Sequence, residues 1–279
     1  MKLEEKLNYF VDLGNLDFLE LENIQKKVMS SNLPNNYLIG ARVNPHINFG
    51  SNRKKNLFSP EVMQSLESSY GKKLFYDENG FIAKNVLEDL KKKGVCGLDF
   101  SVSERGGGAT VYTPGQYLFF PVWDFSFGRS LQEDFKNTVE FNDKIHDVML
   151  EVAREIVPNS FLKEVGYSDT IKDVCRDLYV RKGDDDFKLG SKGIKLCSKT
   201  KKTQGGFSLF KSNCEMDKMG LVQVCGFHPD DLKVSSMESV LGSSLDHDRF
   251  IDLVLEKYSS VVGCKFENMS YEELNLLLK

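Results

Sequence analysis

The sequence has no hydrophobic run long enough to cross a membrane. None of the apolar stretches in its 279 residues approaches the roughly eighteen consecutive apolar residues that span a bilayer. The first residues, from Met1 to Lys6, carry charges of both signs and lack the apolar core of a signal peptide. Their acidic residues also argue against a transit peptide. We therefore expect a cytoplasmic protein that does not contact the membrane.

Paired cysteines are missing as well. The six cysteines include no CxxC pair and form no dense framework, which favours reduced thiols over disulfides. The four histidines are scattered along the chain. Only His228 lies close in sequence to another candidate metal ligand, Cys225, and this spacing alone is a weak signal. We expect no metal site.

An excess of basic residues is also absent. The chain has 37 Lys and Arg against 41 Asp and Glu, a net charge of -4, which argues against a nucleic-acid-binding protein. Three local basic clusters exist, and surface charge is the simplest interpretation of each. They are Arg53–Lys55, Lys91–Lys93, and Lys199 with Lys201–Lys202.

Two common nucleotide-binding patterns are missing, namely the phosphate loop that ends in Lys-Ser/Thr and the strand–GxGxxG–helix unit. A different glycine-rich segment is present. Arg105 is followed by Gly106, Gly107 and Gly108, and the chain continues through Pro114-Gly115-Gln116 into an apolar run that ends at Trp123. Three glycines without Cβ atoms let a ligand lie against the main chain, although glycines of this kind also occur in plain turns.

The pattern of apolar residues predicts an α+β (mixed α/β) fold, with a central mixed sheet flanked by helices in a single domain over residues 1–279. Proline and glycine signals mark several of the element ends. The Asp184–Gly190 segment is expected to turn between two strands, and His146 is expected to be structural. Helices are predicted for Leu16–Met29, from Ser59-Pro60 onward, Lys84–Lys93, Leu131–Val157 and Phe250–Tyr258, and strands for Tyr37–Val43, Tyr117–Trp123, Asp177–Gly183, Gly193–Ser198, Phe207–Phe210 and Leu221–Cys225.

Lys195 and Cys225 are the two candidates for chemistry. A lysine in a half-buried strand that is desolvated has a lowered pKa, and a cysteine at a strand end followed by glycine is accessible as a nucleophile. A neighbouring ammonium would favour the thiolate. Residue types alone favour a plainer interpretation, namely a surface lysine and an inert buried cysteine.

Three motifs in order carry a resemblance to a known family: Arg105-Gly-Gly with Pro114-Gly-Gln116, then Lys195-Leu-Cys-Ser, then Val224-Cys225-Gly226. Together they resemble the lipoyl/octanoyl transferases of the biotin and lipoate protein ligase superfamily. Tyr112 stands where that family usually has a histidine, and Gly205 where it has a second one. The resemblance implies a biotin/lipoate protein ligase-like fold.

The resemblance also implies an activity. Cys225 would take an octanoyl group from octanoyl-acyl carrier protein as a thioester, and a lysine of a lipoyl-domain protein would then receive it as an amide. Acceptors of this kind are the E2 subunits of 2-oxoacid dehydrogenases and the glycine cleavage H protein. Lys195 would act as general acid and base, with no metal, ATP or other cofactor. The substrate-binding residues would be Arg105, Gly106, Gly107, Gly108, Tyr112, Gly115, Gln116 and Gly206.

Two alternatives remain open. Gly108 matches the Gly-Gly-Gly-Ala loop of the ATP-dependent lipoate–protein ligases, which use the same lysine and need no cysteine. The two replaced histidines also allow a non-catalytic relative that binds an acyl carrier or a lipoyl domain. Cys225-Gly226 at the position of the family's nucleophile favours the transferase.

Overall fold

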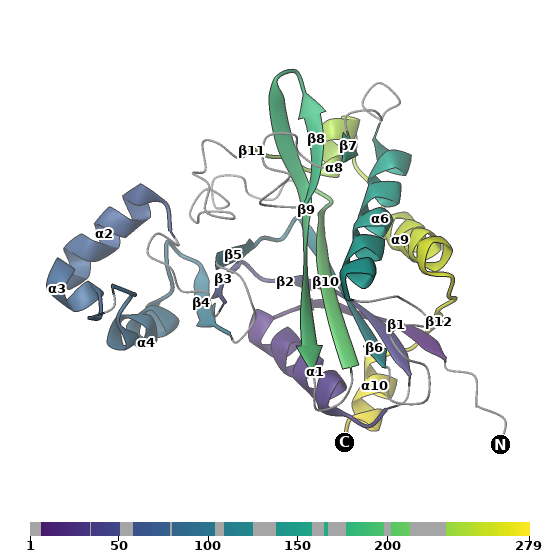
Figure 1. The fold of residues 1–279 in the computed structure, drawn as a ribbon, viewed down its shortest axis with the longest axis horizontal. Coiled ribbons are helices and arrows are strands. Elements are labelled where there is room, and N and C mark those ends of the chain that lie inside the picture. The colour runs from purple at the N-terminus through teal and green to yellow at the C-terminus, as the bar shows by residue number, and fades with distance from the viewer. Residues whose placement is uncertain are drawn as a thin grey trace.

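The computed structural model describes residues 7–33, 35–50, 58–78, 80–103, 109–124, 138–157, 165–166, 177–197, 202–212 and 233–279. Within these ranges the main sheet is mixed and has nine strands. Figure 1 shows how the helices lie around it. Its order is β12 (Glu267–Asn268), β1 (Asn8–Leu16), β2 (Asn36–Val43), β6 (Gln116–Asp124), β10 (Lys202–Phe210), β9 (Asp185–Cys197), β8 (Leu178–Lys182) and β7 (Val165–Gly166), with β11 (Lys233–Val234) beside β9.

Helices cover both faces of this sheet. On one face, α6 (Thr138–Ile156) and α9 (His247–Val262) pack through apolar side chains such as Val148, Val152 and Val254 onto Phe119 and Phe207. On the other face lie α1 (Phe18–Ser30) and α10 (Tyr271–Leu277). Strand residues alternate between the faces because the side-chain period of a strand is two, so β10 contacts both layers.

A smaller sheet lies beside the main one. Within the described ranges it has the order β4 (Asp99–Val102), β3 (His46–Phe49) and β5 (Ala109–Tyr112). Its apolar side packs against α2 (Pro60–Tyr70), α3 (Lys72–Phe75) and α4 (Lys84–Lys93), which stand apart at the left of Figure 1. Within the described residues, α8 (Met237–Leu241) also adjoins α6. No helix in the described part of the chain is long and apolar enough to cross a membrane.

The predicted fold class is confirmed, and so are several element ends. The Ser59 hydroxyl accepts a hydrogen bond from the Val62 amide at the start of α2, and α4 covers the predicted residues. The described part of the Leu131–Val157 helix is α6, on which His146 is buried as a structural residue would be. The predicted strand Leu221–Cys225 lies outside the described residues.

Two predictions were wrong. The segment Asp184–Gly190 is not a long turn, because β9 begins at Asp185 and only Gly183 and Asp184 turn the chain. Gly183 has a φ of 66°, which a two-residue hairpin turn requires, and the guanidinium of Arg181 pairs with the Asp186 carboxylate across the strands at 2.9 Å. Lys202 is not a surface charge, because it is 2% exposed and lies beneath the end of α1.

Candidate functional site

Two of the predicted site residues come together on adjacent strands of the main sheet. The backbone of Lys195 in β9 pairs with Gln204 in β10, and Gly206 pairs with Gly193. Lys195 and Gly206 are therefore diagonal neighbours, although eleven positions separate them in the sequence. The antiparallel pairing of β9 and β10 thus brings Lys195 and Gly206 close together, and their roles in a site stay predictions.

Gly193 and Gly206 leave the sheet without side chains at this point. A Cβ atom built on Gly193 would meet none of the described residues within 4 Å, and one on Gly206 would lie 3.3 Å from the ring of Phe120. Gly205 faces the opposite layer, where a Cβ atom would collide with Ile145 of α6. The bare surface at Gly193 and Gly206 can therefore accommodate a thin ligand directly on the backbone.

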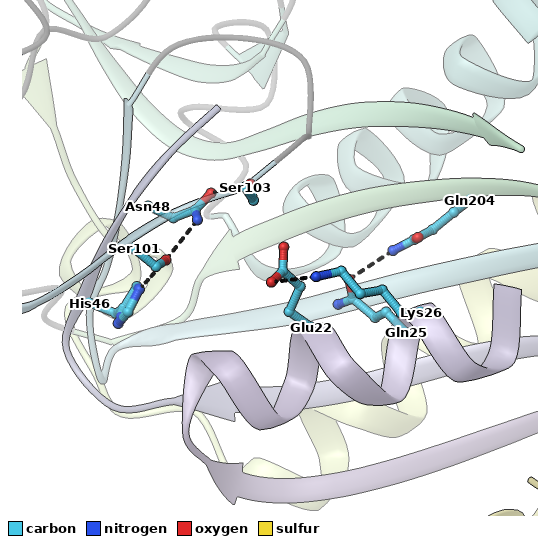
Figure 2. A network of polar contacts seen from close by, with 8 residues as sticks. All are labelled: Glu22, Gln25, Lys26, His46, Asn48, Ser101, Ser103 and Gln204. Atoms are coloured by element: carbon cyan, nitrogen blue, oxygen red, sulfur yellow. Dashed lines mark hydrogen bonds and ion pairs between the residues drawn. The ribbon is translucent and has the colours of Figure 1, made fainter. Parts of the chain in front are cut away.

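This glycine surface lies on the same side of the main sheet as α1. Gln204, two residues before Gly206, donates a hydrogen bond from Nε2 to Oε1 of Gln25 in α1 at 3.0 Å. The next residue of the same helix, Lys26, pairs with Glu22 at 3.0 Å (Figure 2). Gln25 therefore places a polar side chain of α1 beside the part of β10 that precedes Gly206.

The Pro114-Gly115-Gln116 turn connects the two sheets. Gln116 is buried and donates from Nε2 to the carbonyl of Val111 at 3.1 Å, while the carbonyl of Gly115 accepts from the amides of Lys211 and Ser212. These bonds hold the end of β5 against the start of β6 and the end of β10. They give Gly115 and Gln116 a structural role, and their predicted contact with substrate stays a prediction.

Tyr112 lies at the end of β5, opposite His46 of β3. The rings of Tyr112 and His46 both stack on Phe18 of α1, with centroid distances of 4.8 and 4.6 Å. The small sheet therefore places an imidazole directly across from the position at which the resembled family has its histidine.

Arg105, Gly106, Gly107, Gly108 and Cys225 lie outside the described residues. The chain on either side of the first four is described. The Ser103 amide donates to the carbonyl of Phe49 at 2.8 Å, and Ala109 pairs with the same residue. Both ends of the glycine segment are thus attached to the end of β3.

The polar side of the small sheet was not predicted from the sequence. His46 and Asn48 on β3 and Ser101 on β4 are buried, and with Ser103 they form one hydrogen-bonded group, drawn in Figure 2. The signal was present in the alternation of polar and apolar residues in His46-Ile-Asn-Phe49, which is typical of a strand with two unlike faces.

His46 is uncharged at neutral pH. Burial lowers its pKa from 6.5 to about 4, and the nearby carboxylates of Asp99, Glu22 and Asp17 oppose this shift without cancelling it. Within the described residues, no group of three His, Cys, Asp or Glu side chains could hold a metal ion.

Solved structures show which known fold this chain has. The chain aligns with a bipartite lipoate protein ligase from Thermoplasma acidophilum at a TM-score of 0.61 and 11% identity, covering 98% of this chain and 91% of the other. A lipoate-protein ligase A bound with ATP gives a TM-score of 0.60 at 11% identity, with 98% and 92% covered. The fold is therefore that of the lipoate-protein ligases, as the resemblance implied.

The relatives that are similar in sequence are octanoyltransferases. An octanoyltransferase from Caldicellulosiruptor saccharolyticus is 26% identical over 198 residues, which cover 70% of this chain and 74% of the relative. Another, from Desulforamulus reducens, is 21% identical over 96% of both chains. No protein-family model matches. The relatives bear out the predicted resemblance to octanoyltransferases and the predicted class, a transferase enzyme.

Proposed function

We propose that this protein is an octanoyltransferase that moves an octanoyl group from acyl carrier protein to a lysine of lipoyl-domain proteins, E2 subunits and H protein among them. The observation that carries the proposal is the convergence of Lys195 and Gly206 on neighbouring strands, beside a stretch of sheet without side chains. The octanoyltransferases to which the chain is similar support the choice of acyl group.

The glycine surface suits an unbranched acyl chain. Such a chain is only one methylene wide, so it can lie on Gly193 and Gly206 where a branched or cyclic group would meet the ring of Phe120. Burying each methylene against this surface would contribute about 0.8 kcal/mol of binding free energy. A chain of octanoyl length therefore gains much of its affinity from contacts that need no charged partner.

Two acyl transfers complete the proposed reaction. The Cys225 thiolate attacks the carbonyl carbon of the carrier thioester, the bond from that carbon to the carrier sulfur breaks, and the Lys195 ammonium protonates the departing thiolate. The amine of the acceptor lysine then attacks the new thioester. The amide forms as the bond to Cys225 breaks, and the Lys195 amine takes the proton from the attacking nitrogen. Lys195 ends as ammonium and Cys225 as thiolate.

The test is an intact-mass measurement after incubation with octanoyl-acyl carrier protein in the absence of ATP. We expect an adduct with the mass of one octanoyl group, lost in Cys225→Ala and retained in Cys96→Ala, which removes an exposed thiol that belongs to none of the three motifs. An adduct that persists in Cys225→Ala would overturn the thioester mechanism. Lys195→Ala should lower the acylation rate and change its pH profile.

The ligase alternative rests on the fold, since a similar structure is a lipoate-protein ligase bound with ATP. Lipoylation of an acceptor domain that requires ATP and survives Cys225→Ala would favour the ligase. Binding of carrier or acceptor protein with no adduct and no product under either condition would favour the non-catalytic relative.

Of the three basic clusters, Lys91–Lys93 is the one whose side chains are described and exposed together. It closes α4, where Lys91 and Lys93 pair with Glu88 and Asp89. We propose that it steers acidic carrier or acceptor domains to the site. Lys92→Glu should then raise KM for the protein substrate, and high salt should abolish the difference. If Lys92→Glu and the wild type had the same KM at low salt, the proposal would be contradicted.

A further inference from the structure

The two ends of the glycine segment are attached to β3 in different ways. The end before it, at Ser103, is held by its amide bond to Phe49 and by a side-chain bond from its hydroxyl to Asn48. The end after it, at Ala109, begins the regular pairing of β5. The position of Ser103 therefore depends on what fixes Asn48.

Asn48 belongs to a series of three side-chain hydrogen bonds that leads away from Ser103. The Ser103 hydroxyl donates to Oδ1 of Asn48 at 3.0 Å, and Nδ2 of Asn48 donates to Oγ of Ser101 at 2.8 Å. Oγ of Ser101 lies 2.6 Å from Nε2 of His46. Three of these side chains are 6% exposed or less, so water cannot readily replace their bonds.

The proton positions follow from the donors that are available. Ser101 has one hydroxyl proton and already accepts from Asn48, and among the described residues the acceptor within its reach is Nε2 of His46. Because the imidazole is neutral, Nε2 can carry the lone pair while Nδ1 carries the proton. Every donor then points the same way, from Ser103 through Asn48 and Ser101 to His46.

We propose that His46 is a positioning residue, whose neutral imidazole ends this series of hydrogen bonds and thereby fixes the strand end at Ser103 from which the chain continues to Arg105. His46 need not touch the substrate. Its effect on the rate rests on the proposed function, since Arg105 matters there as a substrate-binding residue. The fixed position of Ser103 does not rest on it.

The experiment compares His46→Leu, which removes the acceptor, with His46→Gln, whose amide oxygen can take the place of Nε2. Ser101→Ala interrupts the series without disturbing the packing of His46 on Phe18. Ser69→Ala is the matched control, because it deletes an exposed hydroxyl of α2 in the same part of the molecule. Two quantities are measured, namely hydrogen exchange at the Ser103 amide and the single-turnover rate of acylation by octanoyl-acyl carrier protein.

In His46→Leu and Ser101→Ala we expect exchange at Ser103 to become about tenfold faster, and acylation about tenfold slower, with KM for the carrier unchanged. His46→Gln should restore both, and Ser69→Ala should behave as the wild type. Unchanged exchange at Ser103 in both interrupting variants, or no recovery in His46→Gln, would overturn the proposal. Faster exchange in a protein whose wild type shows no acylation would refute the proposed function and support the positioning role.

Discussion

Lys202 is buried, although lysine side chains are usually exposed to solvent. Its ammonium donates to the carbonyls of Val28 and Ser31 and to the Ser31 hydroxyl, at 2.9 to 3.0 Å. Carbonyls in the last turn of a helix have no partners within the helix, and they attract positive charge. Lys202 therefore joins the end of α1 to the start of β10.

We expect Lys202→Met to lower the free energy of unfolding by about 2 kcal/mol, because methionine keeps much of the apolar stem and removes the three hydrogen bonds. Urea denaturation measures this change. Lys26→Met is the control, since the ion pair between Lys26 and Glu22 is exposed and its loss should cost less than about 0.5 kcal/mol. Equal losses in the two variants would show that Lys202 is not a buried cap.

His46 should make the stability of the protein depend on pH. Its pKa is about 4 in the folded protein and 6.5 in the reference state, so the unfolded chain binds the extra proton as the pH falls below 6.5. The protein therefore loses stability as the pH falls from 6.5 to 4, by about 3 kcal/mol.

This loss can be assigned to His46 by comparison with His46→Gln. The groups facing the imidazole are Asp99 on β4, Glu22 and Asp17 at α1, and Tyr112 on β5, and both proteins retain all of them. The difference in unfolding free energy between wild type and variant should fall steadily from pH 6.5 to pH 4, as measured by urea denaturation at each pH. A difference independent of pH would mean that the imidazole is not buried in its neutral form.

At the scale of an element, β10 contains two neighbouring glycines, one with a structural role and one that we propose to contact the acyl chain. Gly205 packs against α6, where an added Cβ would collide with Ile145 and lie 3.0 Å from Pro121, while its neighbour Gly206 faces the glycine surface. Gly205→Ala should therefore lower the free energy of unfolding by about 1 to 3 kcal/mol. The matched change in the partner strand, Gly193→Ala, should leave stability within about 0.5 kcal/mol.

The same pair tests the acyl site. Gly193→Ala adds a methyl group to the surface on which the acyl chain is proposed to lie, so it should slow octanoyl transfer while the fold stays intact. Thermal denaturation and the acylation rate together separate the two effects. A Gly193→Ala protein with the wild-type acylation rate would show that the acyl chain does not lie over β9.

Elements with strong local signals were predictable from the sequence. Helix α2 begins at Ser59-Pro60 and helix α4 ends at Gly94, as these residue types favour. The apolar residues of α6 and α9 recur with the helical period. The β9 strand was harder to predict, because Asp185 and Asp186 resemble turn residues. They stand in a strand since Arg181 and Lys233 compensate their charge from neighbouring strands. The pairing of Asp185 with Lys233, which is 48 positions away, cannot be seen in a short stretch of sequence.

The residues of the candidate site also differ in whether a local stretch of sequence indicates them. Short, ordered motifs indicate Lys195 and Gly206 as candidates, and their roles stay predictions. The hydrogen bonds of His46 could not be predicted in this way, because its partners Ser101 and Asn48 become neighbours only when β3 pairs with β4. Gln116, predicted to bind substrate, has its amide on the backbone of Val111. A sequence motif indicates that a residue is needed but does not separate contact with a ligand from support of the fold.

At the scale of the whole molecule, the question is whether the two sheets fold together as the predicted single domain. The apolar cluster of the small sheet includes Phe49, Phe58 and Phe100, but it also takes in Phe210, the last residue of β10. The main sheet therefore contributes directly to the core of the small one. The Pro114-Gly115-Gln116 turn adds hydrogen bonds between them.

We predict one cooperative unfolding transition, and Trp123 offers a direct test of it. This is the single tryptophan of the chain, and it is buried in the core of the main sheet. Phe49→Ala removes a fully buried ring from the core of the small sheet and should lower stability by about 3 to 4 kcal/mol. If the sheets unfold together, the midpoint for Trp123 fluorescence in urea must fall with the midpoint for circular dichroism.

Leu74→Ala provides the control, because Leu74 is a largely exposed side chain of α3 and its loss should move neither midpoint appreciably. If Phe49→Ala leaves the Trp123 transition in place while part of the circular dichroism signal is lost earlier, the small sheet and its helices unfold as a separate unit. In that case the hydrogen bonds from His46 to Ser103 would be weakened independently of Lys195 and Gly206. Acylation would then fall in parallel with the early transition, which makes the activity itself a reporter of the coupling between the two sheets.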